Sequence, residues 1–341
     1  MRTVKVKREI GSEFWDIPVS RNTNRLFPDD TRWFISGTAA LQYIIDDIVK
    51  KKSIRTVAIP SWCCNCMITP FIKHGIKVQF YPVYMEDLRL ICNYSSIEAD
   101  CWIVLSYFGY SSYTSIGSPE GIIIRDLTHS VFTEIREDAE YYFGSLRKWA
   151  GFYTGGYAWC RNWNSDTRIP ECDNSYVSLR ARAMTEKKSY IEGKSYSKSF
   201  LELFEQGEDF LDNCETMGAY RQDIEKARLL NVKGIKEQRR NNALVLLSSL
   251  NQWAIFPELG EDDCPLFVPI LLDKEKRNAL QNHLKSRSIY CPVHWPIEKE
   301  HVLTGKTRPL YERELSIVCD QRYDEEDMLR ILRVIDESGI I

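Results

Sequence analysis

The chain has 341 residues, of which 44% are hydrophobic and 27% are charged, and these values exclude extended disorder. Lys and Arg number 45 against 48 Asp and Glu, and the net charge of −3 excludes a bulk positive field for nucleic acid or an anionic membrane. A chain of this length has room for two domains and buries enough apolar surface to fold without disulfides or a structural metal.

The N-terminal residues MRTVKVKREIG contain no apolar run, so the sequence predicts no secretory leader. No apolar stretch approaches the roughly 18 residues that span a bilayer. The 11 cysteines have irregular spacings, which do not suit a disulfide framework. Together these features predict a cytoplasmic protein with reduced thiols.

The first half of the chain alternates helix and strand patterns. Residues 38–52 place apolar side chains at the spacing of a helix that is buried on one face. A second helix is predicted over 64–74. Strands are predicted over 56–60, 77–83, 101–107, 121–126 and 155–160. Their continuous apolar runs are typical of a doubly wound, mainly parallel α/β sheet that is covered on both faces by helices.

The second half is richer in polar helical segments. We expect a helix over 239–250, a strand over 266–272, and helices over 274–286 and 324–338. A boundary near residue 252 divides a large domain, 1–251, from a smaller C-terminal α+β domain, 252–341. The large domain includes an N-terminal arm, 1–30, and a helical insert at about 176–235.

Two segments at predicted strand ends could bind an anion and a cation, respectively. Gly37 and Thr38 begin the first helix, where free N–H groups suit an anion, although an ordinary helix cap would have the same composition. Asp126 ends a strand, with His129 three residues later, and its carboxylate could hold a protonated ring nitrogen. The alternative is a helix-capping aspartate paired with Arg125 or Arg147.

Two further segments carry candidate nucleophiles. Lys148 lies in the segment SLRKW, where a desolvated amine could attack an aldehyde, although most lysines are simply solvated. Cys63 and Cys66 have the C-x-x-C spacing of thiol oxidoreductases, although small packed residues at a helix start would have the same pattern. No second pair of metal ligands has a matching spacing, so no metal site is predicted.

In this order, the segments resemble those of the fold-type I, pyridoxal-phosphate-dependent aminotransferases of the DegT/StrS sugar aminotransferase type. The matching segments are SGTAAL, PSWCCNCMITPFIKHGIKVQFYPV, IIRDLTHSVF, SLRKWAGFYTGG, IYCPVHWP and CDQRYDEEDMLRIL. The resemblance extends from EIGSEFW, near residue 9, to the terminal helix. Arg125 departs from the family, which has an acid before the aspartate.

The resemblance implies pyridoxal 5'-phosphate as cofactor and a homodimer. Lys148 would form the Schiff base and move the proton, Asp126 would keep the pyridine nitrogen protonated, and His129 would lie near the ring. The other cofactor contacts expected from the resemblance are Gly37, Thr38 and Ser145 at the phosphate, and Trp62 or Cys64 at the ring. The candidate substrate contacts are His294, Trp295 and Arg322, for which packing or an ion pair is the alternative.

The implied reaction moves an amino group from an amino acid, with glutamate as the expected donor, to a keto-sugar that is expected to be nucleotide-linked. A sugar dehydration on the same cofactor is less favoured, because family enzymes of that kind replace the lysine by histidine. The sequence also leaves open a non-catalytic sensor with this fold and a thiol oxidoreductase that uses Cys63 and Cys66. The expected partners are small molecules, with no nucleic acid and no membrane.

Overall fold

The computed structural model describes residues 9–133, 138–164, 167–214 and 216–341, so the first eight residues of the predicted arm lie outside it. In the described chain, the largest sheet has seven strands in the order β2-β11-β10-β9-β7-β3-β4. Neighbours from β10 to β4 are parallel, whereas β11 pairs antiparallel with both β10 and β2. The strands are β2 (Arg32–Phe34), β3 (Thr56–Pro60), β4 (Lys77–Tyr81), β7 (Cys101–Leu105), β9 (Ile122–Asp126), β10 (Tyr141–Ser145) and β11 (Gly156–Cys160). The prediction of a mainly parallel α/β sheet is confirmed.

The five predicted strands of this sheet are present, with at most two residues trimmed at an end. The single helix predicted over 64–74 is wrong. The structure has a short 3-10 helix, η1 (Asn65–Met67), followed by α2 (Thr69–Lys73). Pro70 lies at the start of α2, where its missing N–H costs nothing, but it could not continue a helix from residue 64.

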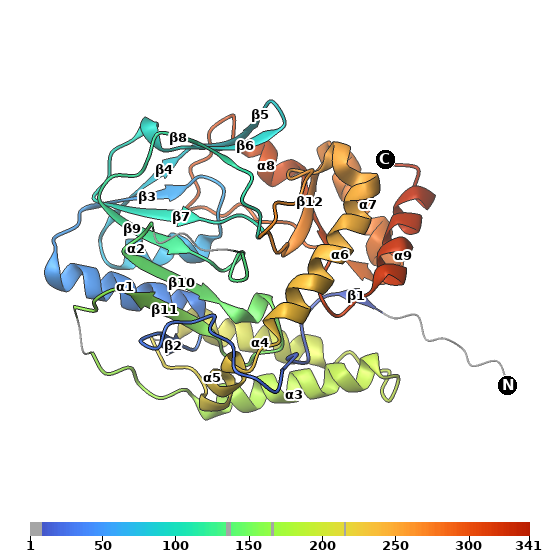
Figure 1. Cartoon of the computed structure of the whole chain (residues 1–341), viewed down its shortest axis with the longest axis horizontal. Helices are drawn as coiled ribbons and strands as arrows, with labels where there is room; N and C mark the ends of the chain where they lie inside the picture. Colours follow the sequence, from blue (N-terminus) through green and yellow to red (C-terminus); the bar gives the residue numbers. More distant parts are fainter. Residues whose placement is uncertain (1–8, 134–137, 165–166, 215) are drawn as a thin grey trace.

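Helices cover both faces of the sheet (Figure 1). On one face, α1 (Gly37–Lys51) packs against β10 and β11, and its buried Ile44 joins the same apolar core as Ala158 of β11. On the other face, Tyr157 of β11 packs in a cluster with Ala227 and Ile235. These two residues belong to α5 (Arg221–Arg228) and α6 (Val232–Leu250). The alternation of side chains along β11 therefore joins both helical layers to one sheet.

The C-terminal part forms a smaller α+β unit around the antiparallel pair β12 (Phe267–Leu271) and β14 (Glu314–Val318). Its helices are α7 (Lys274–Ser286), α8 (Arg308–Arg313) and α9 (Glu325–Glu337). The helix predictions over 274–286 and 324–338 are confirmed. The helix predicted over 239–250 starts seven residues earlier, at Val232, and its last half packs into the C-terminal core. The boundary at residue 252 stays a prediction.

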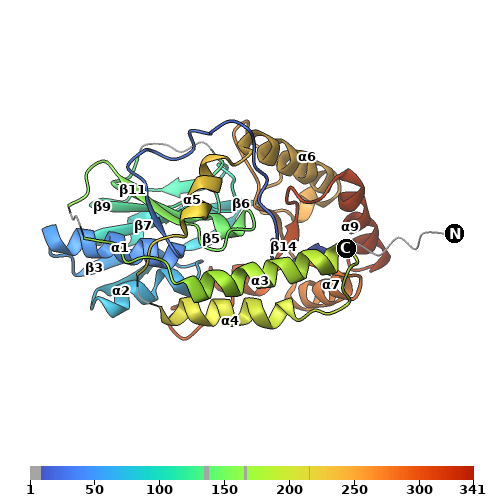
Figure 2. The same cartoon turned by 90° about the horizontal axis from the view of Figure 1, so that it is seen from below.

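The predicted insert contains two antiparallel helices, α3 (Asn174–Ile191) and α4 (Phe200–Asn213), which lie side by side in both views (Figure 2). The arm contributes β1 (Ile10–Gly11), which pairs with β13 (Ile289–Tyr290) of the C-terminal part. The remaining elements are β5 (Val83–Glu86), β6 (Arg89–Asn93), β8 (Thr114–Ile116), η2 (Tyr94–Ser96), η3 (Leu146–Lys148) and η4 (Asn251–Trp253). Among the helices described, none is long and apolar enough to cross a membrane.

Candidate active site

A cavity of about 510 Å³ lies at the carboxyl ends of three parallel strands. Leu105, Asp126 and Ser145 end β7, β9 and β10, and all three line this cavity. We call it the inner cavity. Open α/β sheets bind ligands at this edge, where chain segments diverge from adjacent strands.

Lys148 and His129 are neighbours in the inner cavity because a hydrogen bond connects the segments that carry them. The indole N–H of Trp149 donates a 2.8 Å hydrogen bond to the backbone oxygen of Thr128, which joins the segment after β10 to the segment after β9. The side chain of Ser145 accepts the backbone N–H of Arg147 and begins the single turn that carries Lys148. As a result, Nζ of Lys148 lies 3.2 Å from Nε2 of His129.

The ring of His129 is held neutral by its surroundings. Burial and the nearby positive charge of Lys148 lower its pKa well below the ordinary value for histidine. Nδ1 of His129 is buried, and the described part of the chain offers it no hydrogen-bond partner. A buried polar atom without a partner costs free energy, so this nitrogen is an expected contact for a bound ligand.

Asp126 is a buried carboxyl group, and neither neighbouring arginine forms an ion pair with it. Its Oδ1 accepts the backbone N–H of Thr128 at 2.7 Å. Arg125 is paired instead with Asp138, and Arg147 with Glu208, so the alternative of an arginine-paired cap is not borne out. Burial raises the pKa of Asp126, and only the hydrogen bonds of Thr128 and the charge of Lys148 oppose this.

The start of α1 forms one wall of the inner cavity. Oγ of Ser36 caps the helix by accepting the N–H of Ala39 at 3.2 Å, while Gly37 and Thr38 line the cavity. A Cβ placed on Gly37 would lie 3.4 Å from Cβ of Ser145, so glycine keeps the space between the helix start and Ser145 open. A helix N-terminus with open backbone N–H groups and a nearby hydroxyl group suits an anion.

Of the two residues predicted at the cofactor ring, the structure brings Cys64 to the inner cavity but not Trp62. Trp62 is completely buried behind it, where its ring stacks on Tyr107 with centroids 5.0 Å apart. Trp295 does line the cavity, as does Phe143, and the ring of Trp295 stacks on His129 with centroids 5.3 Å apart. The sequence predicts Trp295 as a substrate contact. It does not reveal the contact with His129, because that contact forms only when the C-terminal part packs against the large sheet.

The thiol pair of a possible oxidoreductase is not built as a redox centre. Cys63 is fully buried, and burial raises the pKa of its thiol well above the ordinary value. The thiols of the described residues are free, and the pKa of Cys66 is also raised. Redox-active cysteines need an accessible thiol with a lowered pKa, which neither Cys63 nor Cys66 provides.

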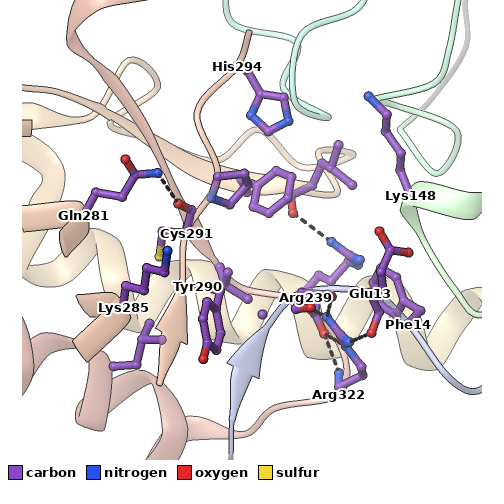
Figure 3. Close-up of a pocket in the computed structure, with 18 of the residues that line it drawn as sticks. Glu13, Phe14, Lys148, Arg239, Gln281, Lys285, Tyr290, Cys291, His294 and Arg322 are labelled. Atoms are coloured by element: carbon purple, nitrogen blue, oxygen red, sulfur yellow. Dashed lines mark hydrogen bonds and ion pairs between the residues drawn. The ribbon is translucent and has the colours of Figure 1, made fainter. Parts of the chain in front are cut away.

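A second cavity, of about 610 Å³, shares Arg147 and Lys148 with the first and extends toward the C-terminal part (Figure 3). We call it the outer cavity. Two of the predicted substrate residues, His294 and Arg322, line it. Arg322 already pairs with Asp320 at 2.8 Å, and it donates to the backbone oxygen atoms of the N-terminal arm, so an ion pair describes it better than a substrate contact.

Comparison with known proteins places this site in a recognised fold. No protein-family model and no curated sequence matches the chain. Among solved structures, a DegT DnrJ EryC1 StrS aminotransferase from Brucella abortus is 16% identical, with a TM-score of 0.57 over 90% of this chain and 85% of that one. PseC from Helicobacter pylori, an aminotransferase involved in the biosynthesis of pseudoaminic acid, is 13% identical, with a TM-score of 0.60 over 96% and 99%. A protein described as a sugar aminotransferase from Streptococcus pneumoniae, in its PLP form, is 12% identical, with a TM-score of 0.60 over 96% and 93%. The chain has the fold of these aminotransferases.

The inner cavity of this aminotransferase fold has the groups that pyridoxal phosphate requires. Gly37 leaves a cradle that a side chain would narrow, and Asp126 is a buried carboxyl group that forms no ion pair within the described residues, where Nδ1 of His129 also has no hydrogen-bond partner. Lys148 supplies an amine at the same cavity. A phosphate, a cationic ring nitrogen and an aldehyde are the complementary groups, and this cofactor carries all three.

Sequence reasoning gave no cavity role to Arg147, Glu13 or Phe14, which line these cavities. Arg147 lines both cavities and pairs with Glu208 of α4. Glu13 and Phe14 bring the N-terminal arm to the outer cavity. Arg147 adjoins a predicted lysine and could have been proposed from that position. The arm has no periodic pattern, so only the folded structure reveals its role.

Proposed function

We propose that this chain is a pyridoxal-phosphate-dependent aminotransferase that moves an amino group from an amino acid to a carbonyl compound of the sugar class. The observation that carries the proposal is the convergence of Lys148, Asp126 and the start of α1 on one cavity at the carboxyl edge of the sheet. The fold shared with sugar aminotransferases supports the same chemistry.

Each group of the inner cavity has a part in holding the cofactor. Gly37, Thr38 and Ser145 would bind the phosphate, and Lys148 would hold the aldehyde end. Asp126 would face the pyridine nitrogen, whose positive charge would offset the cost of burying the carboxylate. When bound, pyridoxal phosphate supplies an electron sink that stabilises a carbanion next to nitrogen. Cys64 and Trp295 would confine the ring.

His129 prepares Lys148 to move a proton. Because the imidazole ring is neutral, Nε2 can accept a hydrogen bond from Nζ of Lys148, 3.2 Å away. This contact directs the amine, and an amine that is oriented in this way can take a proton from one substrate atom and return it to another. His129 is therefore the residue that orients the base, and Lys148 is the base.

The outer cavity suits an anionic substrate. Its lining carries five basic side chains, Arg147, Lys148, Arg239, Lys285 and Arg322, and two acidic ones, Glu13 and Asp320. The proposed donor, glutamate, and the proposed acceptor, a nucleotide-linked keto-sugar, are both anionic. The proposal also includes a homodimer and a cytoplasmic location. An excess of positive charge around a cleft attracts such substrates.

The first prediction is that Lys148 carries the cofactor. The protein is incubated with pyridoxal phosphate, reduced with borohydride and digested, and the peptides are analysed by mass spectrometry. A pyridoxyl group is expected on the peptide containing Lys148, and Lys148→Ala is expected to lose it. Lys285→Ala, which removes another lysine of the outer cavity, is the control and should keep the label.

Labelling that is unchanged in Lys148→Ala would refute the assignment. If the label is on Lys148, the visible absorption band of the cofactor is then recorded before and after addition of glutamate and other amino acids. A change in the band supports an aminotransferase. A band that responds to none of the amino acids would instead favour a non-catalytic sensor.

A further inference from the structure

His294 lines the outer cavity together with Lys148. The labelled side chains of His294 and Lys148 lie on the same side of the cavity in Figure 3. The ring of His294 packs against His129 at 5.4 Å and against Phe108 at 5.3 Å, and the residue is 8% exposed. Its Nε2 atom has no hydrogen-bond partner within the described chain, so this nitrogen is available to a ligand.

A buried carboxyl group lies behind His294. Glu314, the first residue of β14, is completely buried, and its Oε2 accepts the backbone N–H of His294 at 2.6 Å. Oγ of Ser316 lies 2.5 Å from Oε1 of Glu314 and 2.8 Å from Nδ1 of His294. The hydroxyl group of Ser316 therefore bridges the carboxyl group and the imidazole ring. Buried polar atoms at these distances must each have a donor matched to an acceptor.

This matching leaves two arrangements of protons. When Glu314 is neutral, its proton cannot lie on Oε2, which faces the backbone N–H, so it lies on Oε1 and is donated to Ser316. Ser316 then donates to Nδ1 of His294, and Nε2 carries the ring proton. When Glu314 is ionised, Ser316 donates to Oε1 and accepts from Nδ1–H, so Nε2 presents a lone pair to the cavity.

The surrounding charges determine which arrangement holds. Burial raises the pKa of Glu314 to about 8, so the carboxyl group is neutral at pH 7. Arg277 and Cys291 are the other titratable groups that face Glu314. Burial and the positive charge of Lys148 lower the pKa of His294 well below its ordinary value, and His129 is the other titratable group at its ring. The ring of His294 is thus neutral in both arrangements.

We propose that Glu314 and Ser316 are positioning residues that make Nε2 of His294 a hydrogen-bond donor to the outer cavity at neutral pH. The ligand oxygen selected in this way is an acceptor, such as a carboxylate or carbonyl oxygen of a substrate. The assignment to a substrate rests on the proposed function, because that function makes the outer cavity the substrate cavity. The two proton arrangements themselves follow from the contacts of His294, Ser316 and Glu314, and the burial of Glu314 selects between them.

The proposal makes a prediction about the tautomer of His294 that needs no cofactor. The chain has five histidines, and the full-length protein labelled with 15N-histidine is titrated by NMR, with His294→Gln identifying the resonances of His294. In the natural protein, Nε2 is expected to lose its proton and Nδ1 to gain one as the pH passes about 8. In Glu314→Gln, the amide supplies an oxygen to the backbone N–H and an N–H to Ser316, so Nε2 should stay protonated throughout.

Two further variants complete the test. Ser316→Ala removes the hydroxyl group that bridges Glu314 and His294, so the tautomer of His294 should no longer change near pH 8. This variant replaces Glu314→Gln in the test if Glu314→Gln does not fold. Glu312→Gln, which alters a surface carboxylate two residues away, should titrate like the natural protein. The proposal is overturned if His294 titrates alike in the natural protein and in Glu314→Gln, or if it becomes cationic instead of changing tautomer.

The same switch should be visible in substrate use by the cofactor-loaded enzyme. The KM for an oxo acid such as 2-oxoglutarate is expected to rise by about tenfold between pH 7 and pH 9 in the natural protein, because a donor is replaced by a lone pair. In Glu314→Gln the KM should stay nearly constant. A tautomer switch without this difference in KM would overturn the contact with substrate, whereas absence of the cofactor label on Lys148 would refute the proposed function alone.

Discussion

Cys64 is the thiol whose surroundings favour its ionised form. A hydrogen bond from Cys66 and the positive charge of Lys148 lower its pKa to about 7, against the opposing effect of burial. Its Sγ accepts the backbone N–H of Cys66 at 3.4 Å and it lines the inner cavity. Burial raises the pKa of a neighbouring thiol, Cys63, which lies outside the cavity. Adjacent cysteines of one segment therefore differ in reactivity because one faces Lys148 and the other faces the core.

We predict that iodoacetamide modifies Cys64 first. The rate should rise as the pH passes about 7, because the thiolate is the nucleophile, and it should level off above that pH. Cys66→Ala, which removes the side-chain hydrogen bond to Cys64, should move the midpoint to higher pH, and Cys64→Ser should remove the fast phase. Mass mapping of the alkylated peptide is the measurement. A fast phase that survives in Cys64→Ser would contradict the assignment.

The same cysteine links reactivity to the cofactor site. Pyridoxal phosphate in the inner cavity should slow the alkylation of Cys64 because the ring covers this wall. Pyridoxal phosphate should leave the slow modification of Cys172, a partly buried thiol that does not line the inner cavity, unchanged. Equal protection of both thiols would mean that the cofactor acts at a distance and not by contact.

Among the elements, those with a local signal could be predicted and those with a distant partner could not. The helix α7 has its predicted ends because its apolar stripe and polar neighbours lie within one segment. By contrast, β1 is two residues long and exists only through its pairing with β13, which lies near the other end of the chain. The same distinction holds in the site. Asp126 ends a strand that the sequence predicts, and Lys148 lies in a segment that resembles the aminotransferase family, whereas the exclusion of Trp62 from the cavity follows from its packing on Tyr107.

The arm that borders the outer cavity depends on a glycine. Gly11 in β1 has φ +91°, and a Cβ there would lie 2.3 Å from the backbone oxygen of Tyr290 in β13. Its N–H donates to the hydroxyl group of Tyr323 at 2.8 Å. Glycine is required here both by the backbone conformation and by the close approach of the two strands.

We predict that Gly11→Ala detaches the arm from β13. The left-handed conformation alone costs about 1–2 kcal/mol, and the overlap with Tyr290 adds to it. Gly75→Ala is the matched control, because Gly75 has φ +69° and open space around it, so it carries only the backbone cost. Hydrogen exchange of the arm amides should accelerate in Gly11→Ala and stay slow in Gly75→Ala. Equal exchange in the two variants would show that the overlap with Tyr290 is relieved without loss of the pairing.

At the scale of the whole molecule, the two cavities meet at Lys148 and are built from parts that are distant in sequence. The large sheet supplies Asp126, the turn after β10 supplies Lys148, the C-terminal part supplies His294, and the arm supplies Glu13. A ligand in the inner cavity would therefore contact segments that pack together only in the folded chain. A group that binds the folded chain and not the unfolded chain stabilises the folded state.

The last prediction follows from that coupling. At about one hundred times its dissociation constant, pyridoxal phosphate should add about 2.7 kcal/mol to the free energy of unfolding and raise Tm by about 4 °C. Pyridoxal, which lacks the phosphate, should raise Tm less at the same concentration, because it leaves the start of α1 unfilled. In Gly37→Ala, a methyl group narrows the cradle beside Ser145, so the response to pyridoxal phosphate should fall to the level of pyridoxal. Equal shifts for the two compounds in the natural protein would mean that the phosphate binds elsewhere, and no shift with either would refute a cofactor site in the inner cavity.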